Sequence, residues 1–231
     1  MGVFLESPSL RQLLFALMAA MSMGSGSTGL AAELTPLPQS LEDAGFQLIS
    51  DDRNVKVYDK NSQTEIRLAA ESHFEFPPAR VLRVILDYEG QVGAIKRISE
   101  SRVLKCGDNW LLVYQRLNLP FVNDRDYTLF VKWGTNADTS WVIYKAVTNL
   151  GPKEKAEVVR VKHNEGSWQL TPDASGKGTV ARYQMTIDMG GWIPQWLVRP
   201  NTIKEMPAVF DDIRSLFSLE KKGESRCLSK L

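Results

Sequence analysis

The sequence has few of the residues that usually hold metal ions. It contains two cysteines, Cys106 and Cys227, and two histidines, His73 and His163. The histidines are far apart in the sequence, and neither has another ligand at the spacing of a helical or finger-type site. We therefore expect no metal centre and no cofactor.

An excess of charge of one sign is also missing. The 28 lysines and arginines nearly balance the 27 aspartates and glutamates, which gives a net charge of +1. Attraction to a polyanion needs a concentrated basic patch, and none is visible in the sequence. We expect no nucleic-acid partner, and we expect the main partner to be uncharged.

Catalytic motifs are absent as well. The chain has no Gly-x-Ser-x-Gly, His-Glu-x-x-His or phosphate-binding glycine loop. Asp124 and Asp126 stand two apart, but a catalytic pair of carboxylates needs unequal environments and an intervening water or proton acceptor, which the sequence does not show. Arg125 between them is expected to be a structural ion-pair partner, because a buried arginine must be paired.

The most apolar run, LLFALMAAMSM after Arg11, is too short for a membrane span. Small residues follow it as far as Ala32, just before Glu33, which resembles a secretory signal peptide. We expect residues 1–32 to be such a signal and the protein to be exported to the periplasm. An uncleaved anchor and a cytosolic start are the rival interpretations, since Glu6 lies in the expected basic region and Leu30 is large for a cleavage site.

A chain of 231 residues is long enough for one sizeable core and short for two. We expect one domain over 33–222 and a flexible, charged tail over 223–231. Export would permit oxidation of Cys106 and Cys227, but one lies in a predicted turn and the other in this tail. We therefore expect two unpaired thiols.

Periodicity predicts an α+β protein with a run of antiparallel strands and a long C-terminal helix. A short helix capped by Ser40 is expected over 40–44, with Asp43 three residues further on. Prolines at 77 and 78 end one strand and open a helix over 79–88. The expected strands cover 55–58, 65–76, 101–104, 110–119, 126–133, 141–147, 158–163, 168–171 and 181–189.

The segment 181–199, ARYQMTIDMGGWIPQWLVR, is the centre of this prediction. It begins with a strand that is apolar on one face and polar on the other, and two glycines then allow a change of direction. A helix follows with an apolar stripe from Ile203 to Phe217, which must lie on the apolar face of a sheet. Pro200 and Pro207 each remove a backbone donor, so we expect this helix to be bent or broken.

Four short motifs occur here in a specific order: Arg125-Asp126-Tyr127, Gly166-Ser167-Trp168, Ile187-Asp188 and Gly191-Trp192-Ile193-Pro194. In this order they resemble the C-terminal half of the START domain, a lipid-transfer module. The resemblance covers roughly 40–219, and its first half rests more on pattern than on motif. It implies the helix-grip fold, in which a curved antiparallel sheet wraps around the C-terminal helix and encloses an apolar cavity.

The resemblance also implies roles for individual residues. Arg125, Asp126, Trp168, Trp192 and Pro194 would support the fold. The connection Leu119, Pro120, Phe121 and Val122 resembles the loop that gates the tunnel, although it would equally suit packing under the helix. The cavity lining would comprise Tyr127, Leu129, Val131, Trp133, Val159, Val161, Tyr183, Met185, Ile187, Ile203, Met206 and Phe210.

A solid core built from the same residues is the alternative to a cavity. Some family members meet a ligand hydroxyl with a charged pair, one partner coming from the strand that here holds Gln115 and Arg116 and the other from the position of Val131. A valine lacks that charge, which leaves the ligand class open among phospholipid, acyl chain, sterol-like or isoprenoid molecules and quinones.

The function that follows from the resemblance is an exported, monomeric protein that binds or transfers one apolar lipid without catalysis and contacts membranes transiently. An enzyme of the wider helix-grip superfamily, such as a cyclase or hydrolase acting on a hydrophobic substrate, is the first alternative. An interaction domain without a cavity is the second.

Overall fold

Alternation of apolar and polar residues builds a curved sheet through most of the chain. The computed structural model describes residues 40–62, 65–120, 122–191, 193, 195–219 and 227–228, with the backbone alone at 195–198. The expected signal segment, Phe121, Trp192 and Pro194 fall outside the described residues. The elements are β1 Gln47–Asp52, β2 Val55–Asp59, β3 Ile66–Phe74, α2 Pro78–Leu86, β4 Ile98–Gly107, β5 Trp110–Leu117, β6 Asp124–Asn136, β7 Thr139–Ala146, β8 Val158–Arg160, β9 His163–Pro172, β10 Thr179–Asp188 and α3 Gln195–Leu219.

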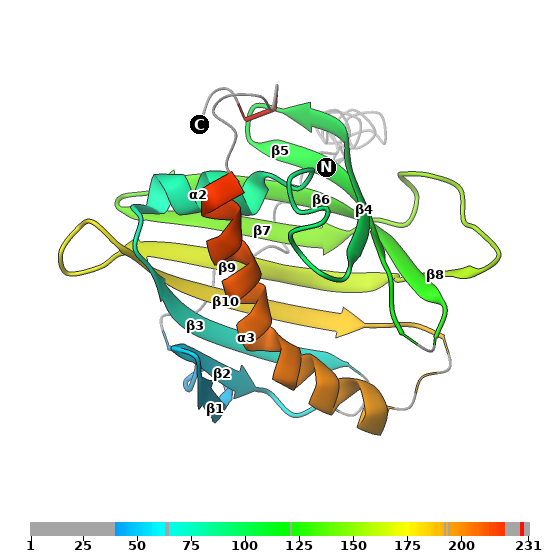
Figure 1. Cartoon of the computed structure of the whole chain (residues 1–231), viewed down its shortest axis with the longest axis horizontal. Helices are drawn as coiled ribbons and strands as arrows, with labels where there is room; N and C mark the ends of the chain where they lie inside the picture. The colour runs from blue at the N-terminus through cyan, green and yellow to red at the C-terminus, as the bar shows by residue number, and fades with distance from the viewer. Residues whose placement is uncertain are drawn as a thin grey trace, which may run out of the picture. The chain divides into compact units, whose positions relative to one another are not determined.

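The sheet is open, with β1 at one edge and β4 at the other. Its order is β1-β2-β3-β10-β9-β7-β6-β5-β4, and neighbouring strands on this path are antiparallel. The predicted antiparallel strand at 158–163 is instead a short strand, β8, which pairs in parallel with the start of β6. Both helices lie on one face of the sheet, with α3 running across β9, β10 and β3 (Figure 1).

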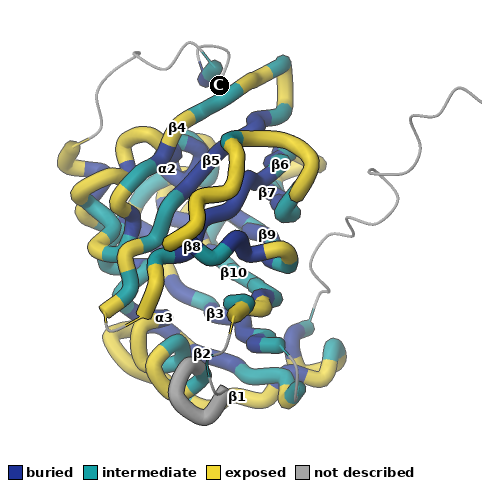
Figure 2. The backbone as a smooth tube through the Cα atoms, turned by 90° about the vertical axis from the view of Figure 1, so that its right-hand side faces the viewer, coloured by how far each residue is buried: buried dark blue, intermediate teal, exposed yellow. Residues whose placement is uncertain are grey.

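The strand predicted at 181–189 is the centre of the sheet, as β10. It pairs with β3 on one side and β9 on the other, so that Tyr183 stands opposite both Ala70 and Trp168. Ala181 and Ile187 of the same face are buried in the core. Figure 2 shows the contrast with the edge strand β1, which is largely exposed.

Helix α3 covers the inner face of the sheet with the predicted apolar stripe. Met206, Phe210, Ile213, Leu216 and Phe217 are all buried against the sheet. The helix runs without a break from Gln195 to Leu219, with Pro200 and Pro207 inside it. Of the expected bend or break, the break does not occur, because burial of one continuous apolar face outweighs the two missing backbone donors.

Two N-terminal elements differ from the prediction. The Ser40 hydroxyl does accept a hydrogen bond from the Asp43 backbone at 3.1 Å, but the expected helix is only a turn. It ends at Gly45, whose φ of 83° is a left-handed conformation that does not continue a helix. Strand β1 was not predicted, since a bulge between Leu48 and Ser50 interrupts its alternation.

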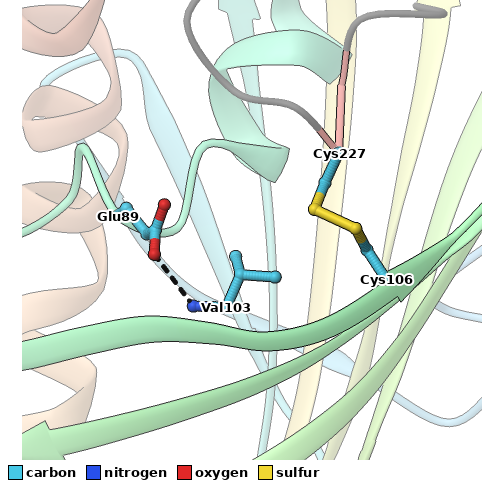
Figure 3. Close-up of a disulfide and its surroundings, with 4 residues drawn as sticks. All are labelled: Glu89, Val103, Cys106 and Cys227. Atoms are coloured by element: carbon cyan, nitrogen blue, oxygen red, sulfur yellow. Dashed lines mark hydrogen bonds between the residues drawn. A yellow bond between two sulfur atoms is a disulfide. The ribbon is translucent and has the colours of Figure 1, made fainter.

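The expectation that the two cysteines stay unpaired is wrong. Cys106, near the end of β4, forms a disulfide with Cys227, which lies 121 residues later (Figure 3). Leu228 is buried in the core beside it, so an apolar contact brings this part of the predicted tail to the sheet. On the same strand the Val103 backbone donates a hydrogen bond to the Glu89 carboxylate at 3.1 Å.

Candidate functional site

The predicted lining residues share one face of the sheet, beneath α3, but they divide into two groups by accessibility. Most are packed with little or no accessible surface. This group comprises Tyr127, Leu129, Val131, Trp133, Val161, Ile187, Met206 and Phe210.

A second group keeps accessible surface while lying on the inner face. Tyr183 and Met185 of β10 and Ile203 of α3 are only partly buried, although all three pack against the core. Burial nevertheless raises the pKa of the Tyr183 hydroxyl. This accessible surface marks the part of the predicted lining that is open to a ligand, near the N-terminal half of α3. Val159 is also partly buried, and it lies beside the glycine turn that follows β10.

The C-terminal half of α3 closes the inner face with aromatic packing. The Phe210 ring is 5.9 Å from the ring of Phe74 and 5.4 Å from that of Trp168. The ring centroids of Phe217 and Phe76 are 4.3 Å apart. Trp168 in turn stacks on Tyr183, with 4.3 Å between the ring centroids.

A pair of tyrosine hydroxyls lies between the aromatic packing under the C-terminal half of α3 and the accessible side chains near its N-terminal half. The hydroxyls of Tyr144, on β7, and Tyr183, on β10, are 2.7 Å apart. The strand between them carries Gly166, where a Cβ atom would come within 2.4 Å of the Tyr144 hydroxyl and 2.3 Å of the Gln184 carbonyl oxygen. The glycine of the Gly-x-Trp motif therefore leaves room for Tyr144 to reach across β9.

A second polar group lies further along the same face. Tyr127 donates a hydrogen bond to the Gln115 side-chain oxygen at 3.1 Å. The Gln115 amide nitrogen donates to the Gln91 side-chain oxygen at 2.9 Å and to the Ser101 hydroxyl at 3.1 Å. Gln115, on the strand where the resemblance placed one charged partner, is thus the centre of an uncharged network. Gln91, Ser101 and Tyr144 were missed.

Arg125 and Asp126 are both buried, as predicted, but they do not pair with each other. Asp126 accepts hydrogen bonds from Arg160 at 2.6 and 3.0 Å and from the Tyr114 hydroxyl at 3.0 Å. The partner missed by the prediction is Arg160, whose pKa is raised mainly by its hydrogen bonds to Asp126. A single arginine within the apolar segment VVRV was the sequence signal for it.

Arg125 joins two loops instead of forming an ion pair, so the expectation of an ion pair is wrong. Its guanidinium donates to the backbone carbonyls of Asn123, Met189 and Gly190, the last two at 3.4 and 3.3 Å. Burial lowers the pKa of Arg125. One side chain therefore links the residue that precedes β6 to the connection between β10 and α3.

The described part of the predicted gate loop faces outward. Pro120 is exposed, Leu119 is partly buried, and Val122 keeps 36% of its surface. An exposed valine and proline do not pack under the helix, whereas an apolar loop tip in water suits contact with another apolar phase.

Ion pairs hold α3 along both of its sides. On the β1–β3 side, Arg199 pairs with Asp59, and Asp211 pairs with Arg53 at 2.8 Å. On the other side, Glu205 pairs at 2.6 Å with Arg97, which precedes β4. These contacts fix the helix over the inner face.

A separate pocket of about 240 Å³ is strongly polar, and its lining belongs to the opposite face of the sheet. Its charged side chains already pair with one another, because His163 contacts both Glu65 and Glu165, and Glu65 also accepts hydrogen bonds from Arg67. Its lining consists of Phe46, Lys60, Glu65, Arg67, His163, Glu165, Gln184 and Thr186. Such a lining does not suit an apolar ligand.

The described residues contain neither a candidate metal cluster nor a helix that could span a membrane. No group of three or more histidine, cysteine, aspartate or glutamate side chains is placed to hold a metal ion. None of the helices in the described part of the chain is long and apolar enough to cross a membrane.

A curved antiparallel sheet that holds one long C-terminal helix against its inner face defines the helix-grip class of proteins. The START domain family model matches residues 95–223, which is more than half of the chain. The chain therefore belongs to the START domain family.

Several solved structures are similar. A STAR-related lipid transfer protein from Xanthomonas axonopodis, solved as the fragment 25–204, is 27% identical, with a TM-score of 0.68 over 75% of this chain and 99% of that one. Human STARD10 is 16% identical, with a TM-score of 0.67 over 79% and 81% of the two chains. Human StAR-related lipid transfer protein 5 is 14% identical, with a TM-score of 0.64 over 76% and 88%. A search of curated proteins found no match.

Proposed function

We propose that this protein binds one apolar lipid beneath the N-terminal half of α3 and transfers it between membranes without catalysis. The observation that carries the proposal is the accessible surface of Tyr183, Met185 and Ile203 on the inner face of a START domain. Removing apolar surface from water is worth about 25 cal/mol per Å², so such a space can carry a molecule that water does not dissolve. The similar Xanthomonas axonopodis protein bears the name of a lipid transfer protein.

The carrier is favoured over the enzyme because of where the charged side chains are placed. The carboxylates considered for catalysis, Asp124 and Asp126, are held by Arg116 at 2.7 Å and by Arg160 at 2.6 Å. A carboxylate whose oxygens already accept hydrogen bonds from an arginine is poorly placed to accept a proton from a substrate. On this account the protein needs no cofactor and acts as a monomer.

Export to the periplasm forms part of the proposal. The disulfide between Cys106 and Cys227 supports it, because such bonds persist mainly in oxidising compartments. The signal segment expected at residues 1–32 agrees with this location. An exported carrier would move its ligand through an aqueous space between membranes.

Transient membrane contact is assigned to the gate loop, where Pro120 and Val122 are exposed beside Phe121. The experiment is lipid transfer from labelled phosphatidylcholine vesicles to unlabelled ones, with Phe121→Asp and Val122→Asp as variants. We expect each variant to slow transfer and to leave the melting curve unchanged. Leu48→Asp is the matched control, since Leu48 is 54% exposed on the edge strand β1. Absence of transfer by the wild-type protein, or equal loss in the Leu48→Asp control, would contradict this function.

A further inference from the structure

Four tyrosines gather on the inner face of the sheet, each from a different part of the chain. Tyr88 follows α2, Tyr127 lies on β6, Tyr144 on β7 and Tyr183 on β10. Besides burial, ionisation of Tyr183 would raise the pKa of Tyr88, Tyr127 and Tyr144, so the four hydroxyls lie in one region. The 2.7 Å contact between Tyr144 and Tyr183 is the centre of this tyrosine cluster.

The tyrosine cluster has hydrogen-bonding capacity left over. One proton lies between the Tyr144 and Tyr183 hydroxyls, so the second hydroxyl of this pair keeps a proton to donate. Neither hydroxyl has a further hydrogen-bond partner among the described residues, and the same holds for Tyr88. Because Tyr183 keeps accessible surface, a ligand that occupies this space can reach the pair.

The surroundings of the tyrosine cluster are uncharged. Burial is the main cause of the raised pKa of Tyr88, Tyr127 and Tyr144, and the other contributions come from tyrosines of the same group. No carboxylate, lysine or arginine contributes to the pKa of these residues in the part of the chain that the structure describes. The nearby Gln115 network is likewise neutral.

We infer that the tyrosine cluster binds the polar group of the ligand, and that this group is an uncharged hydrogen-bond acceptor such as a ketone, quinone, ester carbonyl or hydroxyl oxygen. This inference rests on the proposed function and adds the ligand class to it. A phosphate, carboxylate or ammonium group brought here would lose its water without gaining a counter-charge. A pure hydrocarbon would leave the spare hydroxyls without a partner.

The test is selective uptake from vesicles by the full-length, delipidated protein with its disulfide intact. Phosphatidylcholine vesicles would carry equal trace amounts of heptadecane, heptadecan-2-one and hexadecanoate at pH 7.5, and mass spectrometry would quantify the protein-bound fraction. We expect bound heptadecan-2-one to exceed each of the other two probes by about tenfold. It gains one buried hydrogen bond that heptadecane cannot make, and it avoids the desolvation of a charged group that hexadecanoate must undergo.

The double variant Tyr144→Phe/Tyr183→Phe removes both hydroxyls of the pair, and it should lower the excess of ketone over alkane about tenfold. Each single variant leaves one hydroxyl that can still donate to the ketone. Tyr58→Phe is the matched control, because Tyr58 is also buried but belongs to a separate apolar cluster outside the main core. The wild-type ratio tests the inference even if the double variant is unstable.

The outcomes separate the two claims. Three results would overturn the inference and leave the carrier function standing. These are equal uptake of all three probes, preference for hexadecanoate, and an undiminished ketone excess in the double variant Tyr144→Phe/Tyr183→Phe. Uptake of none of the three would contradict the proposed function itself.

Discussion

At the scale of single residues, two neighbours on β6 show that equally buried charged groups can have different kinds of partner. Asp126 is enclosed and meets Arg160, whereas Arg125 is equally enclosed and meets only backbone carbonyl oxygens. The carbonyls are polar enough to replace part of the water around the guanidinium, and they belong to loops that must stay together. The first residue therefore stabilises the sheet, and the second connects two loops.

Replacement of Arg160 by methionine should leave Asp126 buried with Tyr114 as its remaining partner. Loss of one member of a buried ion pair costs about 3–5 kcal/mol, and we expect that fall in the free energy of unfolding, measured with urea. Arg53→Met is the control, because Arg53 and its partner Asp211 keep 45% and 40% of their side-chain surface exposed. It should cost less than about 1 kcal/mol. Equal effects of the two substitutions would contradict this account.

The sequence indicated that Arg125 and Asp126 were structural, but it did not reveal their partners. Arg160 reaches Asp126 through the parallel pairing of β8 with β6, and no local pattern predicts pairing between residues 34 positions apart. The sequence showed that Val131 cannot be a charged partner, but it did not show the neutral network around Gln115. The hydroxyl of Tyr144 went unnoticed because WVIYKA resembles ordinary core.

Buried tyrosines also set the behaviour of the protein at high pH. Burial, followed by the charge of Asp126, raises the pKa of Tyr114 to about 12 from its ordinary value of 10. An acid whose pKa is raised in the folded state stabilises the fold fully below pH 10, and this stabilisation is lost as the pH rises through 12. The urea midpoint should be insensitive to these tyrosines up to about pH 9 and should fall above pH 10. Tyr114→Phe should show a shallower fall, and a midpoint independent of pH up to 12 would contradict the account.

At the scale of elements, the strand β9 illustrates how a glycine determines what its neighbours can do. Gly166 lies between β7 and β10, and any side chain there meets both the Gln184 carbonyl and the Tyr144 hydroxyl. The hydroxyls of Tyr144 and Tyr183 can therefore meet across β9 only because Gly166 has no Cβ atom.

Gly166→Ala should destabilise the protein by about 3 kcal/mol, the upper end of the usual overpacking cost, because one of the atoms met is backbone. Gly176→Ala serves as the comparison. A Cβ atom at Gly176 meets nothing within 4 Å, and only its φ of 68° imposes strain, so about 1 kcal/mol is expected. Urea unfolding of both variants checks the order, and a larger loss at Gly176 would refute the packing argument.

The elements with regular alternation or a helical stripe were predictable, because burial of one face imposes the pattern. β10 and α3 are the clearest cases. β1 escaped prediction because a bulge shifts its register, and the continuity of α3 through Pro200 and Pro207 depends on packing that no local rule includes.

At the scale of the whole molecule, the disulfide links Cys227 to Cys106 on the edge strand β4. The bonded cysteines are 121 residues apart, a separation at which no local pattern predicts that they meet.

The double variant Cys106→Ser/Cys227→Ser should be less stable by about 2–5 kcal/mol, as expected for loss of a native cross-link that closes a long loop. Thermal unfolding of the wild-type protein with and without a reducing agent provides the second measurement. The reduced wild type and the double variant should melt together and below the oxidised protein. An unchanged melting temperature after reduction would show that the bond contributes nothing to stability.

The most direct test of the carrier account is native mass spectrometry of the protein expressed from its full sequence, followed by organic extraction and identification of what is released. The account predicts one apolar molecule per protein chain, with an uncharged oxygen-bearing group. A protein that emerges empty, and that also fails to take up lipid from vesicles, would contradict it.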